Sequence, residues 1–385
     1  MKKIVFVTTL PQTVFFLLGE HIEYLKAKGY SVEVITSKGI WLNSDQIAEK
    51  FNIPVHTVSF TRTITPVKDL KCMFKLIILF LKLRPDILHV STPKASILAI
   101  VAAFLTGVKN RIYTVRGLVY LSPKNKVLPV MFLIEFIACR LATKVLAVSD
   151  SNRKLLFKHK LCNSKKIEVL GNGSSHGVDA SERFNPARFE KERVATFRES
   201  IGLRKNSVVF GFVGRLVKDK GIEDFACAWE MFTKKYSDAE LVIIGPSVEP
   251  RDCISNECFE FLKLRKDVHF FFDITDPVEY YTVMDVFVLP SYREGFPNVV
   301  LEAGAMCVPV ITSNAPGCID SVLDNETGLI TSVGDPALLC QKMEILYSNP
   351  HLRKQFGDNA RKRALELFSP ELICNLQEKL YRELI

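Results

Sequence analysis

The chain has 385 residues, of which 48% are hydrophobic and 24% charged, and this composition suits two folded domains and excludes a disordered or fibrous protein. Its ten cysteines form no Cys-x-x-Cys pair or zinc-like spacing, so reduced thiols in the cytoplasm are expected. The net charge of +9 is unevenly distributed: residues 1–180 hold 26 Lys+Arg and 11 Asp+Glu (+15), whereas residues 181–385 hold 25 and 31 (−6).

The first half begins with an apolar run, Ile4–Val7, that resembles a signal peptide but is soon interrupted by polar residues. We therefore interpret it as a buried strand. Further strand-like runs alternate with helix-like patterns, which predicts a parallel sheet. These runs are Ser31–Ile35, Asp86–Val90, Arg111–Val115, Lys144–Val148 and Ile167–Leu170. No apolar run reaches the roughly 20 residues that a membrane-spanning helix needs.

A cluster of turn-forming residues, Gly171–Asp179, follows the sixth strand, and the charge balance changes sign just after it. We place a domain boundary there, giving domains 1–180 and 181–368 and a terminal helix over 369–385. The second domain shows the same alternation, so a second parallel sheet is expected. Its strand-like runs are Val208–Val213, Ala239–Ile244, Asp267–Phe272, Asp285–Leu289 and Val308–Thr312.

Basic residues follow the first strand of the second domain. Gly214 allows a ligand to approach the backbone, Arg215 offers a planar fork of donors and Lys220 a compact charge, a pairing suited to two phosphate groups. A lysine at a helix start opposes the helix dipole, which favours a functional role for Lys220. For Lys218, by contrast, an exposed structural position is sufficient.

Two glutamates frame a loop-to-helix turn in the same domain. Glu294 follows the strand-like run Val286–Leu289, at the sheet edge where open α/β sheets bind ligands, and Glu302 lies in the first turns of the next helix. Pro297 suits the first turn of that helix. The backbone N–H groups of residues 298–300 are expected to face an anion. An ordinary capping role remains an alternative for Glu302.

These motifs resemble, in the same order, the carboxyl-terminal half of the family 4 retaining glycosyltransferases. The resemblance covers about 150 residues, and several ordered motifs are more specific than a single pair of glutamates. It rests on Gly214–Gly221, Leu289–Ala303, Gly328-Leu329 and Asp335. It implies the GT-B fold, an α/β fold of two Rossmann-like domains that face each other across a cleft, with the last helix crossing back to the first domain.

The resemblance also implies a role for each matched residue. Arg215 and Lys220 would hold the diphosphate of a nucleotide sugar, Glu294 the hydroxyls of the transferred sugar, and Glu302 the ribose hydroxyls. The remaining contacts to sugar and phosphates would come from Gly214, Gly295, Phe296, Pro297, Asn298, Val299 and Val300.

The amino-terminal half resembles a subset of bacterial polysaccharide transferases (capsule, O-antigen and exopolysaccharide) through His89–Ala95, Tyr113–Gly117 and Gly173–Asp179. Its first loop, Thr8–Thr13, lacks the glycines of many relatives, and Arg116 stands where many relatives have a histidine. Arg116 stays protonated and cannot act as a base, so we interpret it as a positive group near a phosphate, with a structural salt bridge as the alternative. Lys94 and Arg116 are the candidate acceptor-binding residues.

The expected reaction is transfer of a sugar from a nucleotide diphosphate sugar to an acceptor hydroxyl, with retention of the anomeric configuration. A UDP-hexose or UDP-N-acetylhexosamine is the first choice of sugar donor, ahead of GDP-mannose. No Asp-x-Asp pair is present, so neither a metal nor another cofactor is expected.

Four other functions compete with this one. Glycoside hydrolysis by paired carboxylates does not need the phosphate-binding residues. A nicotinamide oxidoreductase is disfavoured because no Gly-x-Gly-x-x-Gly follows the first strand. A sugar-nucleotide epimerase of the same fold and a catalytically inactive nucleotide-sugar-binding module remain open.

The excess of basic residues in 1–180 predicts an anionic partner, such as an anionic membrane surface or a phosphorylated acceptor. A solvated basic surface is an alternative. Nucleic acid is disfavoured, because no nucleic-acid-binding signature is present. Residues 71–75 and the segment from Lys124 to Arg140 combine basic and apolar residues and suggest membrane contact, with a core position as the alternative for the apolar ones. The resemblance implies a lipid-diphosphate-linked saccharide as acceptor and a peripheral location on the cytoplasmic face of the membrane.

Overall fold

Parallel strands alternate with helices along the whole chain, as the apolar pattern predicts. The computed structural model describes residues 1–39, 42–61, 65–121, 128–247 and 253–385. They form two units, Met1–His176 together with Pro370–Ile385, and Gly177–Ser369. The chain leaves the first unit after residue 176, where 180 was expected, and returns after 369, where 368 was expected.

The first unit contains a seven-stranded parallel sheet in the order β3-β2-β1-β4-β5-β6-β7. Strand β3 was not predicted, because Val55-His56-Thr57 holds a single apolar residue and is half-buried or exposed. The other strands match the predicted runs to within two residues at either end. The strands are β1 (Lys3–Val7), β2 (Ser31–Thr36), β3 (Val55–Thr57), β4 (Ile87–Val90), β5 (Asn110–Val115), β6 (Lys144–Ala147) and β7 (Ile167–Glu168).

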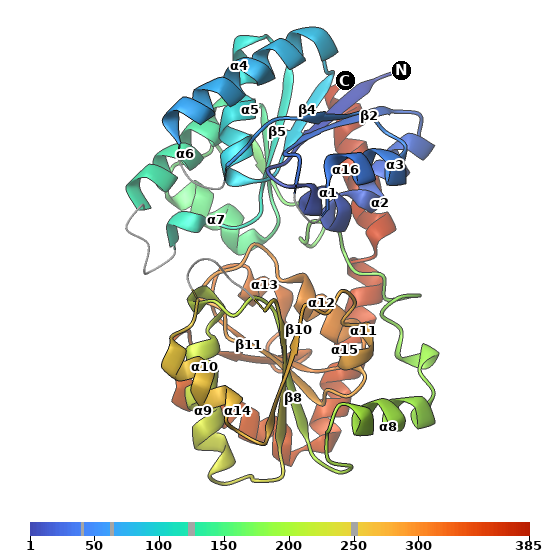
Figure 1. Cartoon of the computed structure of the whole chain (residues 1–385), viewed down its shortest axis with the longest axis vertical. Coiled ribbons are helices and arrows are strands. Elements are labelled where there is room, and N and C mark those ends of the chain that lie inside the picture. The colour runs from blue at the N-terminus through green and yellow to red at the C-terminus, as the bar shows by residue number, and fades with distance from the viewer. Residues whose placement is uncertain (40–41, 62–64, 122–127, 248–252) are drawn as a thin grey trace. The chain divides into compact units, whose positions relative to one another are not determined.

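Helices cover both faces of this sheet, and each face has its own apolar core. In Figure 1, α4, α5, α6 and α7 lie on one side of the strands and α1, α2, α3 and α16 on the other. Their bounds are α1 (Pro11–Leu17), α2 (Gly19–Ala27), α3 (Ser44–Phe51), α4 (Pro66–Leu83), α5 (Pro93–Leu105), α6 (Leu128–Leu141), α7 (Asp150–Lys158) and α16 (Pro370–Leu384).

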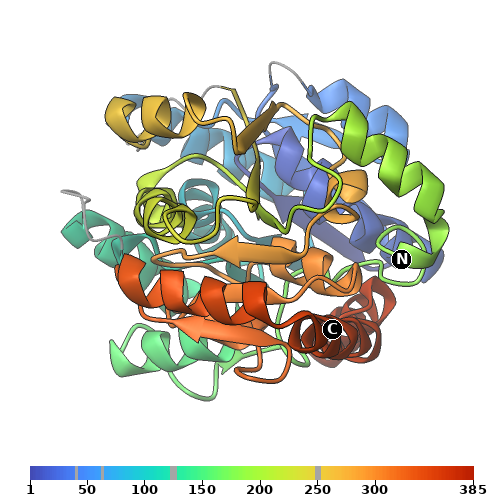
Figure 2. The same ribbon diagram turned by 90° about the horizontal axis from the view of Figure 1, so that it is seen from below.

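Helix α16, red in Figures 1 and 2, belongs to the first unit although the chain reaches it only after the second. Leu380 and Tyr381 lie in the core beside α2, and the Tyr381 hydroxyl is hydrogen-bonded to Nδ1 of His89 in β4. The Tyr30 hydroxyl donates to the Glu378 carboxylate at 2.9 Å. The predicted return of the terminal helix to the first domain is thereby confirmed.

The second unit contains a six-stranded parallel sheet in the order β10-β9-β8-β11-β12-β13, which confirms the predicted α/β class. Strand β13 was not predicted, because its apolar run is only a few residues long and begins with a glycine. The strands are β8 (Val209–Val213), β9 (Glu240–Gly245), β10 (Val268–Phe272), β11 (Val286–Leu289), β12 (Val310–Ser313) and β13 (Gly328–Thr331).

Helices α9, α10 and α14 lie on one side of this sheet in Figure 1, and α11, α12 and α15 on the other. The bounds are α8 (Lys191–Ser200), α9 (Ile222–Thr233), α10 (Asn256–Lys263), α11 (Val278–Tyr281), α12 (Asn298–Ala305), α13 (Cys318–Ser321), α14 (Pro336–Ser348) and α15 (Pro350–Leu367).

The strand orders define a switch point in each sheet, where successive connections leave in opposite directions. In the first sheet it lies between β1 and β4, and in the second between β8 and β11, which pair directly. Open α/β sheets bind ligands beyond the carboxyl ends of the strands at such points. The loops after these four strands are therefore the places to look for a site.

All ten cysteines lie within the described residues, and no disulfide joins them. Across the described ranges, no helix combines the length and the apolar character that crossing a bilayer requires.

Candidate functional site

The loops after β8 and β11 lie against each other at the switch point of the second unit. Gly214 and Arg215 directly follow β8, and residues Lys218–Lys220 form a short 3₁₀ turn before α9. Gly221 ends this turn with φ +70°, and a Cβ at this position would lie 2.0 Å from the carbonyl oxygen of Pro290 in the other loop. Only glycine therefore permits this close approach.

The predicted basic and acidic residues meet at this point. The Lys220 ammonium and the Glu294 carboxylate form an ion pair, and their side chains are only 18% and 14% exposed. The hydroxyl of Ser291 donates a second hydrogen bond to the same carboxylate oxygen at 2.9 Å. Because both charges are largely shielded from water, the Coulomb attraction between them is screened less than in a surface ion pair.

Further contacts fix the two loops. The Arg293 guanidinium is 2.6 Å from the carboxylate of Asp219, whose backbone carbonyl accepts the N–H of Tyr292 at 2.8 Å. Behind the glutamate, Gly317 has φ +81°, and a Cβ there would lie 2.5 Å from the backbone oxygen of Glu294. The charged groups thus occupy a rigid, preorganised setting.

Helix α12 begins one residue later than predicted. Pro297 is the N-cap, and Asn298 is the first helical residue. The Val300 N–H already donates to the Pro297 carbonyl at 3.0 Å, which removes one of the three backbone donors expected to face an anion. The Asn298 side chain donates to the carbonyl of Gly177 at 2.7 Å, in the segment that opens this unit.

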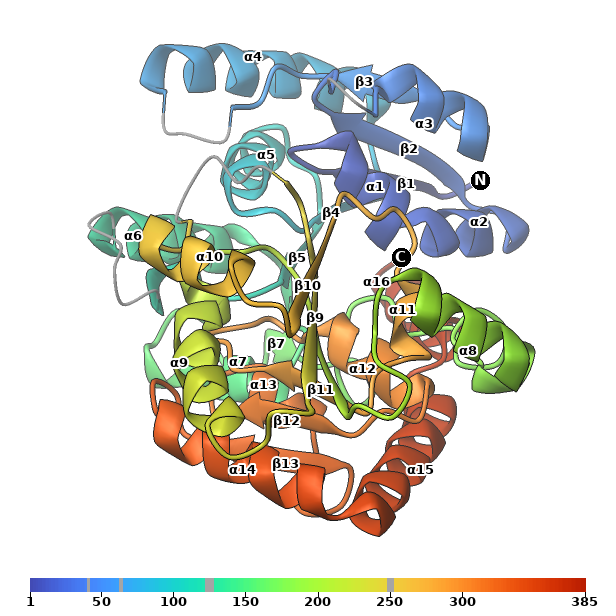
Figure 3. The same ribbon diagram turned by 60° about the horizontal axis from the view of Figure 1, so that its bottom comes forward.

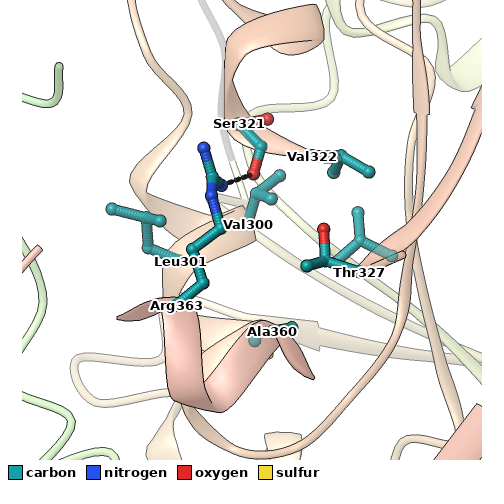
Figure 4. A pocket seen from close by; sticks show the side chains of 9 residues that line it. Val300, Leu301, Ser321, Val322, Thr327, Ala360 and Arg363 are labelled. Carbon is teal, nitrogen blue, oxygen red and sulfur yellow. Dashed lines mark hydrogen bonds between the residues drawn. The ribbon is translucent and has the colours of Figure 1, made fainter. Parts of the chain in front are cut away.

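The side chains around this helix start point into the protein. Phe296 packs on Phe368, with ring centroids 5.4 Å apart. Val300 and Leu301 line the pocket drawn in Figure 4, where Arg363 donates to the Ser321 carbonyl. Val300 therefore offers a ligand neither its buried side chain nor its N–H, which is bonded to Pro297.

Glu302 lies in the second turn of α12, and its carboxylate accepts the hydroxyl proton of Tyr281 at 2.8 Å. No side-chain cap occurs at this helix start, so the alternative capping role of Glu302 is not observed. Burial raises the pKa of Glu302, while the Tyr281 hydrogen bond and the charge of Arg183 partly oppose this shift.

Arg215, by contrast, is exposed beside the half-buried Gly214. The loop is packed closely, because a Cβ on Gly245 would lie 2.6 Å from the Gly214 carbonyl oxygen. The predicted phosphate-binding pair thus comprises one exposed arginine and one ion-paired lysine.

The switch point of the first unit is lined by hydroxyl groups. The Thr9 N–H donates to the Thr92 hydroxyl at 3.0 Å, and the two hydroxyls are 2.9 Å apart, which joins the loops after β1 and β4. Lys94 opens α5 but forms an ion pair with Asp69 at 2.7 Å. Its ammonium also donates to the Thr61 hydroxyl at 2.5 Å, so this candidate acceptor residue already has protein partners.

Arg116, after β5, lies among three histidines in this unit. Among the described residues Arg116 makes no ion pair, and its Nε is buried without a hydrogen-bond partner, so the salt-bridge alternative is wrong for this part of the chain. Burial, and then the Arg116 charge, lower the pKa of His21 to about 4 and those of His89 and His176 to about 3. Burial also lowers the pKa of Arg116 to about 10. The cluster therefore holds neutral histidines around one cation.

Several residues of the site were not predicted from the sequence, namely Tyr281, Ser291, Asp219, Arg293 and His21. Ser291 lies within the motif Leu289–Ala303 that carries the family resemblance, but no role was predicted for it. Tyr281 could not be found by pattern, because its partner Glu302 lies 21 positions away. Within the described residues, no group of three or more His, Cys, Asp or Glu side chains could hold a metal ion.

Comparison with known families gives two matches. Residues 194–363 match the family described as Glycosyl transferases group 1, and residues 3–149 match the family described as Glycosyl transferase 4-like. The first match covers every predicted residue of the second unit, and the second covers Lys94 and Arg116.

Two curated relatives are similar over long stretches. The capsular polysaccharide biosynthesis glycosyltransferase CapM of Staphylococcus aureus is 35% identical over 380 residues, which cover 99% of this chain and 97% of CapM. The UDP-Gal:alpha-D-GlcNAc-diphosphoundecaprenol alpha-1,3-galactosyltransferase of Escherichia coli is 30% identical over 297 residues, 76% of this chain and 73% of that enzyme.

Solved structures show the same fold. A glycosyltransferase from Rickettsia africae has a TM-score of 0.80 at 22% identity and covers 100% of this chain and 98% of its own. Anabaena Alr3699/HepE, solved with UDP and glucose, has a TM-score of 0.81 at 18% identity with both chains fully covered. The long match to CapM, together with the family matches in both units, shows that this chain belongs to the group 1 glycosyltransferases and has the GT-B fold.

Proposed function

We propose that this protein transfers a hexose or N-acetylhexosamine from its UDP derivative to a hydroxyl of a lipid-diphosphate-linked saccharide, with retention of configuration and without a metal ion. The observation that carries the proposal is the Lys220–Glu294 ion pair at the switch point of the second sheet, beside Arg215. This point is where a nucleotide binds in open α/β sheets.

Leaving-group stabilisation would be the main source of catalysis. As the bond from the anomeric carbon to the β-phosphate oxygen breaks, negative charge grows on the phosphate. Lys220 is held in place by Glu294 and by the packed loops, so its charge needs no reorganisation, and the exposed Arg215 adds a bidentate donor.

The two glutamates would bind hydroxyl groups. Glu294 is tied to Lys220 and Ser291, and Glu302 to Tyr281, which suits carboxylates that orient a sugar and a ribose more than a pair of acids that exchange protons. The acceptor hydroxyl would form its bond to the anomeric carbon on the face that the phosphate leaves, and its proton would pass to the departing phosphate oxygen. Arg116 would lie near a phosphate in the first unit.

The sugar donor and the acceptor are proposed from the relatives. The Escherichia coli enzyme is named for UDP-Gal and a diphosphoundecaprenol acceptor, and HepE was solved with UDP. CapM is named for capsular polysaccharide biosynthesis. These names support a role in surface polysaccharide synthesis, and we propose the cytoplasmic face of the membrane as its location.

Helix α4 supports peripheral binding to an anionic membrane. One of its faces is buried, but an apolar row on another face is exposed, at the three- and four-residue spacing of a helical stripe. This row, called the α4 stripe below, comprises Val67 (70% exposed), Leu70 (50%), Phe74 (58%), Ile78 (66%) and Leu81 (57%). Lysines 68, 71, 75 and 82 flank it, the arrangement of a helix that lies in a membrane interface.

The predicted membrane segment from Lys124 to Arg140 is described only from residue 128. There, α6 exposes Val130 and Leu133 but buries Glu135. Residues 124–127 lie outside the described part of the chain.

The test is to incubate the purified chain with UDP-sugars and GDP-mannose and a lipid diphosphate saccharide, with EDTA present and absent. We expect a product heavier by one sugar from one UDP-sugar, equal yields with and without EDTA, and the anomeric configuration of the donor sugar in the product by NMR. Conversion of UDP-sugar without acceptor would instead support the epimerase. Lack of transfer from every nucleotide sugar, with UDP still bound, would support an inactive binding module.

A further inference from the structure

A second pocket lies in the first unit. It has a volume of about 420 Å³ and lies between α4 and the segment that follows β3. Figure 3 shows α4 at the edge of this unit, next to α5, on which it packs. The pocket is lined by Val58, Ser59, Phe60, Thr61, Lys68, Lys71, Cys72 and Lys75.

The lining divides into an apolar floor and a basic rim. Val58, Phe60 and Cys72 are 1%, 8% and 5% exposed and form the floor. Lys68, Lys71 and Lys75 lie on one row of the α4 surface, because they are three and four residues apart, and all three are exposed. None of the described lining residues is acidic, and the nearby Asp69 is paired with Lys94.

This charge pattern fits a polyanion with an apolar tail. Three ammonium groups around one hollow attract a ligand with several negative charges, as a diphosphate has. Each of the first three residues of the α4 stripe directly precedes one of these lysines, so the basic row and the apolar row run side by side along the helix. A lipid diphosphate bound here could place its chain along the α4 stripe.

The pocket also adjoins the polar edge of the first sheet. Thr61 lines the pocket and accepts a hydrogen bond from Lys94, which lies in the first turn of α5, the helix that follows β4. The neighbouring Thr92 joins this loop to Thr9. A saccharide attached to a diphosphate in the pocket would therefore extend past Lys94 toward the switch point of this sheet.

We propose that this pocket is the site for the diphosphate of the lipid-linked acceptor, held by Lys68, Lys71 and Lys75. The inference rests on the proposed function for the identity of the ligand. It adds a binding site to the first unit and gives each substrate its own diphosphate site. The diphosphate of the sugar donor would bind at Lys220 and that of the acceptor at α4. It also assigns Lys94 a positioning role at the pocket wall, because its ammonium already contacts Asp69 and Thr61.

The test measures binding of farnesyl diphosphate, a short isoprenoid diphosphate that stays in solution, to the whole chain by calorimetry. The double variant Lys71→Ala/Lys75→Ala should bind it at least about tenfold more weakly, because two of three charges around the diphosphate are lost. Lys82→Ala is the matched control, since this exposed lysine continues the same row outside the pocket, and it should bind as the parent chain does. Farnesol, which lacks the diphosphate, should bind more weakly than farnesyl diphosphate.

Equal affinity of the parent chain and the double variant would overturn the proposal. It would also be overturned if the double variant lost binding to phosphatidylglycerol vesicles while keeping its affinity for farnesyl diphosphate, because the lysines would then serve the bilayer surface. UDP binding, measured in parallel, separates this proposal from the proposed function. If the parent chain transferred no sugar to a lipid diphosphate saccharide but still bound farnesyl diphosphate through these lysines, the proposed function would be rejected. The pocket would still be a diphosphate-binding site.

Discussion

Lys220 and Glu294 form an ion pair although they lie 74 positions apart, in the loops that follow two adjacent strands. The pair joins a residue proposed to bind phosphate to one proposed to bind sugar. A nucleotide sugar that binds both would therefore meet two groups that already hold each other in place, which reduces the cost of ordering them.

Replacing Lys220 by alanine should lower turnover by about a hundredfold or more, the usual effect of removing one preorganised group that stabilises developing charge. The measurement is steady-state transfer at saturating UDP-sugar, with the melting temperature recorded beside it. Lys218→Ala is the control, because this lysine lies in the same 3₁₀ turn and has no proposed contact with the ligand. Near-normal turnover of Lys220→Ala would remove Lys220 from the mechanism.

Arg116→Met should lower turnover without lowering the free energy of unfolding. Removing a buried cation that has no ion-pair partner among the described residues relieves its desolvation penalty, and methionine fills a similar volume. Transfer assays and urea titration measure the two effects. A loss of stability with unchanged turnover would show that Arg116 is structural.

Glu302 should make UDP binding depend on pH, because its carboxylate is proposed to bind the ribose. Burial raises the pKa of Glu302, so this dependence should lie at higher pH than the titration of an ordinary glutamate. Protonation on acidification weakens a carboxylate as acceptor of ribose hydroxyls, so UDP affinity should fall as the pH is lowered, and the fall should begin at a higher pH than it would for an exposed glutamate. Tyr281→Phe should move this fall to higher pH, since the lost hydrogen bond stabilises the charged form. In the variant Glu302→Gln, the pH dependence of UDP affinity should reflect only the titration of UDP itself. If this variant showed the same pH profile as the parent chain, the proposed ribose-binding role of Glu302 would be contradicted.

The α4 stripe should determine membrane binding. Phe74→Ser/Ile78→Ser removes two exposed apolar side chains, so sedimentation with phosphatidylglycerol vesicles should decrease while UDP affinity stays constant. Leu264→Ser is a matched control, because this leucine is 80% exposed in the second unit. If the double variant sediments as the parent chain does at low salt, α4 does not bind the membrane.

Glu135 gives the first unit a pH-dependent stability. Burial in α6 raises the pKa of Glu135 to about 7. The Tyr113 hydroxyl donates a hydrogen bond to this carboxylate at 2.9 Å, which partly opposes the rise. A raised native pKa means that the native state holds the proton more tightly than the unfolded state. Its stabilisation is complete below the unfolded pKa of about 4.5 and is lost as the pH rises through about 7.

The corresponding change in the free energy of unfolding is at most about 3 kcal/mol. Glu135→Gln keeps the Tyr113 contact without the titration, so the difference in unfolding free energy between the variant and the parent should grow from about pH 5 to about pH 8. Denaturant titrations at the two pH values measure it. Parallel pH profiles would show that Glu135 does not titrate in this range.

The fold was largely predictable because its strands are short apolar runs buried on both faces. Strand β3 escaped prediction because Val55-His56-Thr57 lies at the sheet edge, where burial does not require apolar residues. Strand β13 lies at an edge of the second sheet and is only 4 residues long. Edge strands carry a weaker pattern than central ones.

The site was predictable at its motif residues and not at the contacts between them. Arg215, Lys220, Glu294 and Glu302 lie in a recognisable order, but the hydrogen bond from Tyr281 depends on how α11 packs beside α12. The pairing of Lys94 with Asp69 likewise depends on α4 packing against α5. Such partners are set by tertiary packing, which local sequence does not encode.

The position of α16 has a consequence for how the chain folds during synthesis. The first unit emerges from the ribosome first, yet Leu380 and Tyr381 complete one of its two cores and the partner of His89 is made last. Residues 1–176 therefore keep part of their apolar surface exposed until the whole second unit and α16 have been translated. Cutting the chain at residue 176 would not yield two self-sufficient halves, because the earlier fragment would lack a helix that belongs to its own interior.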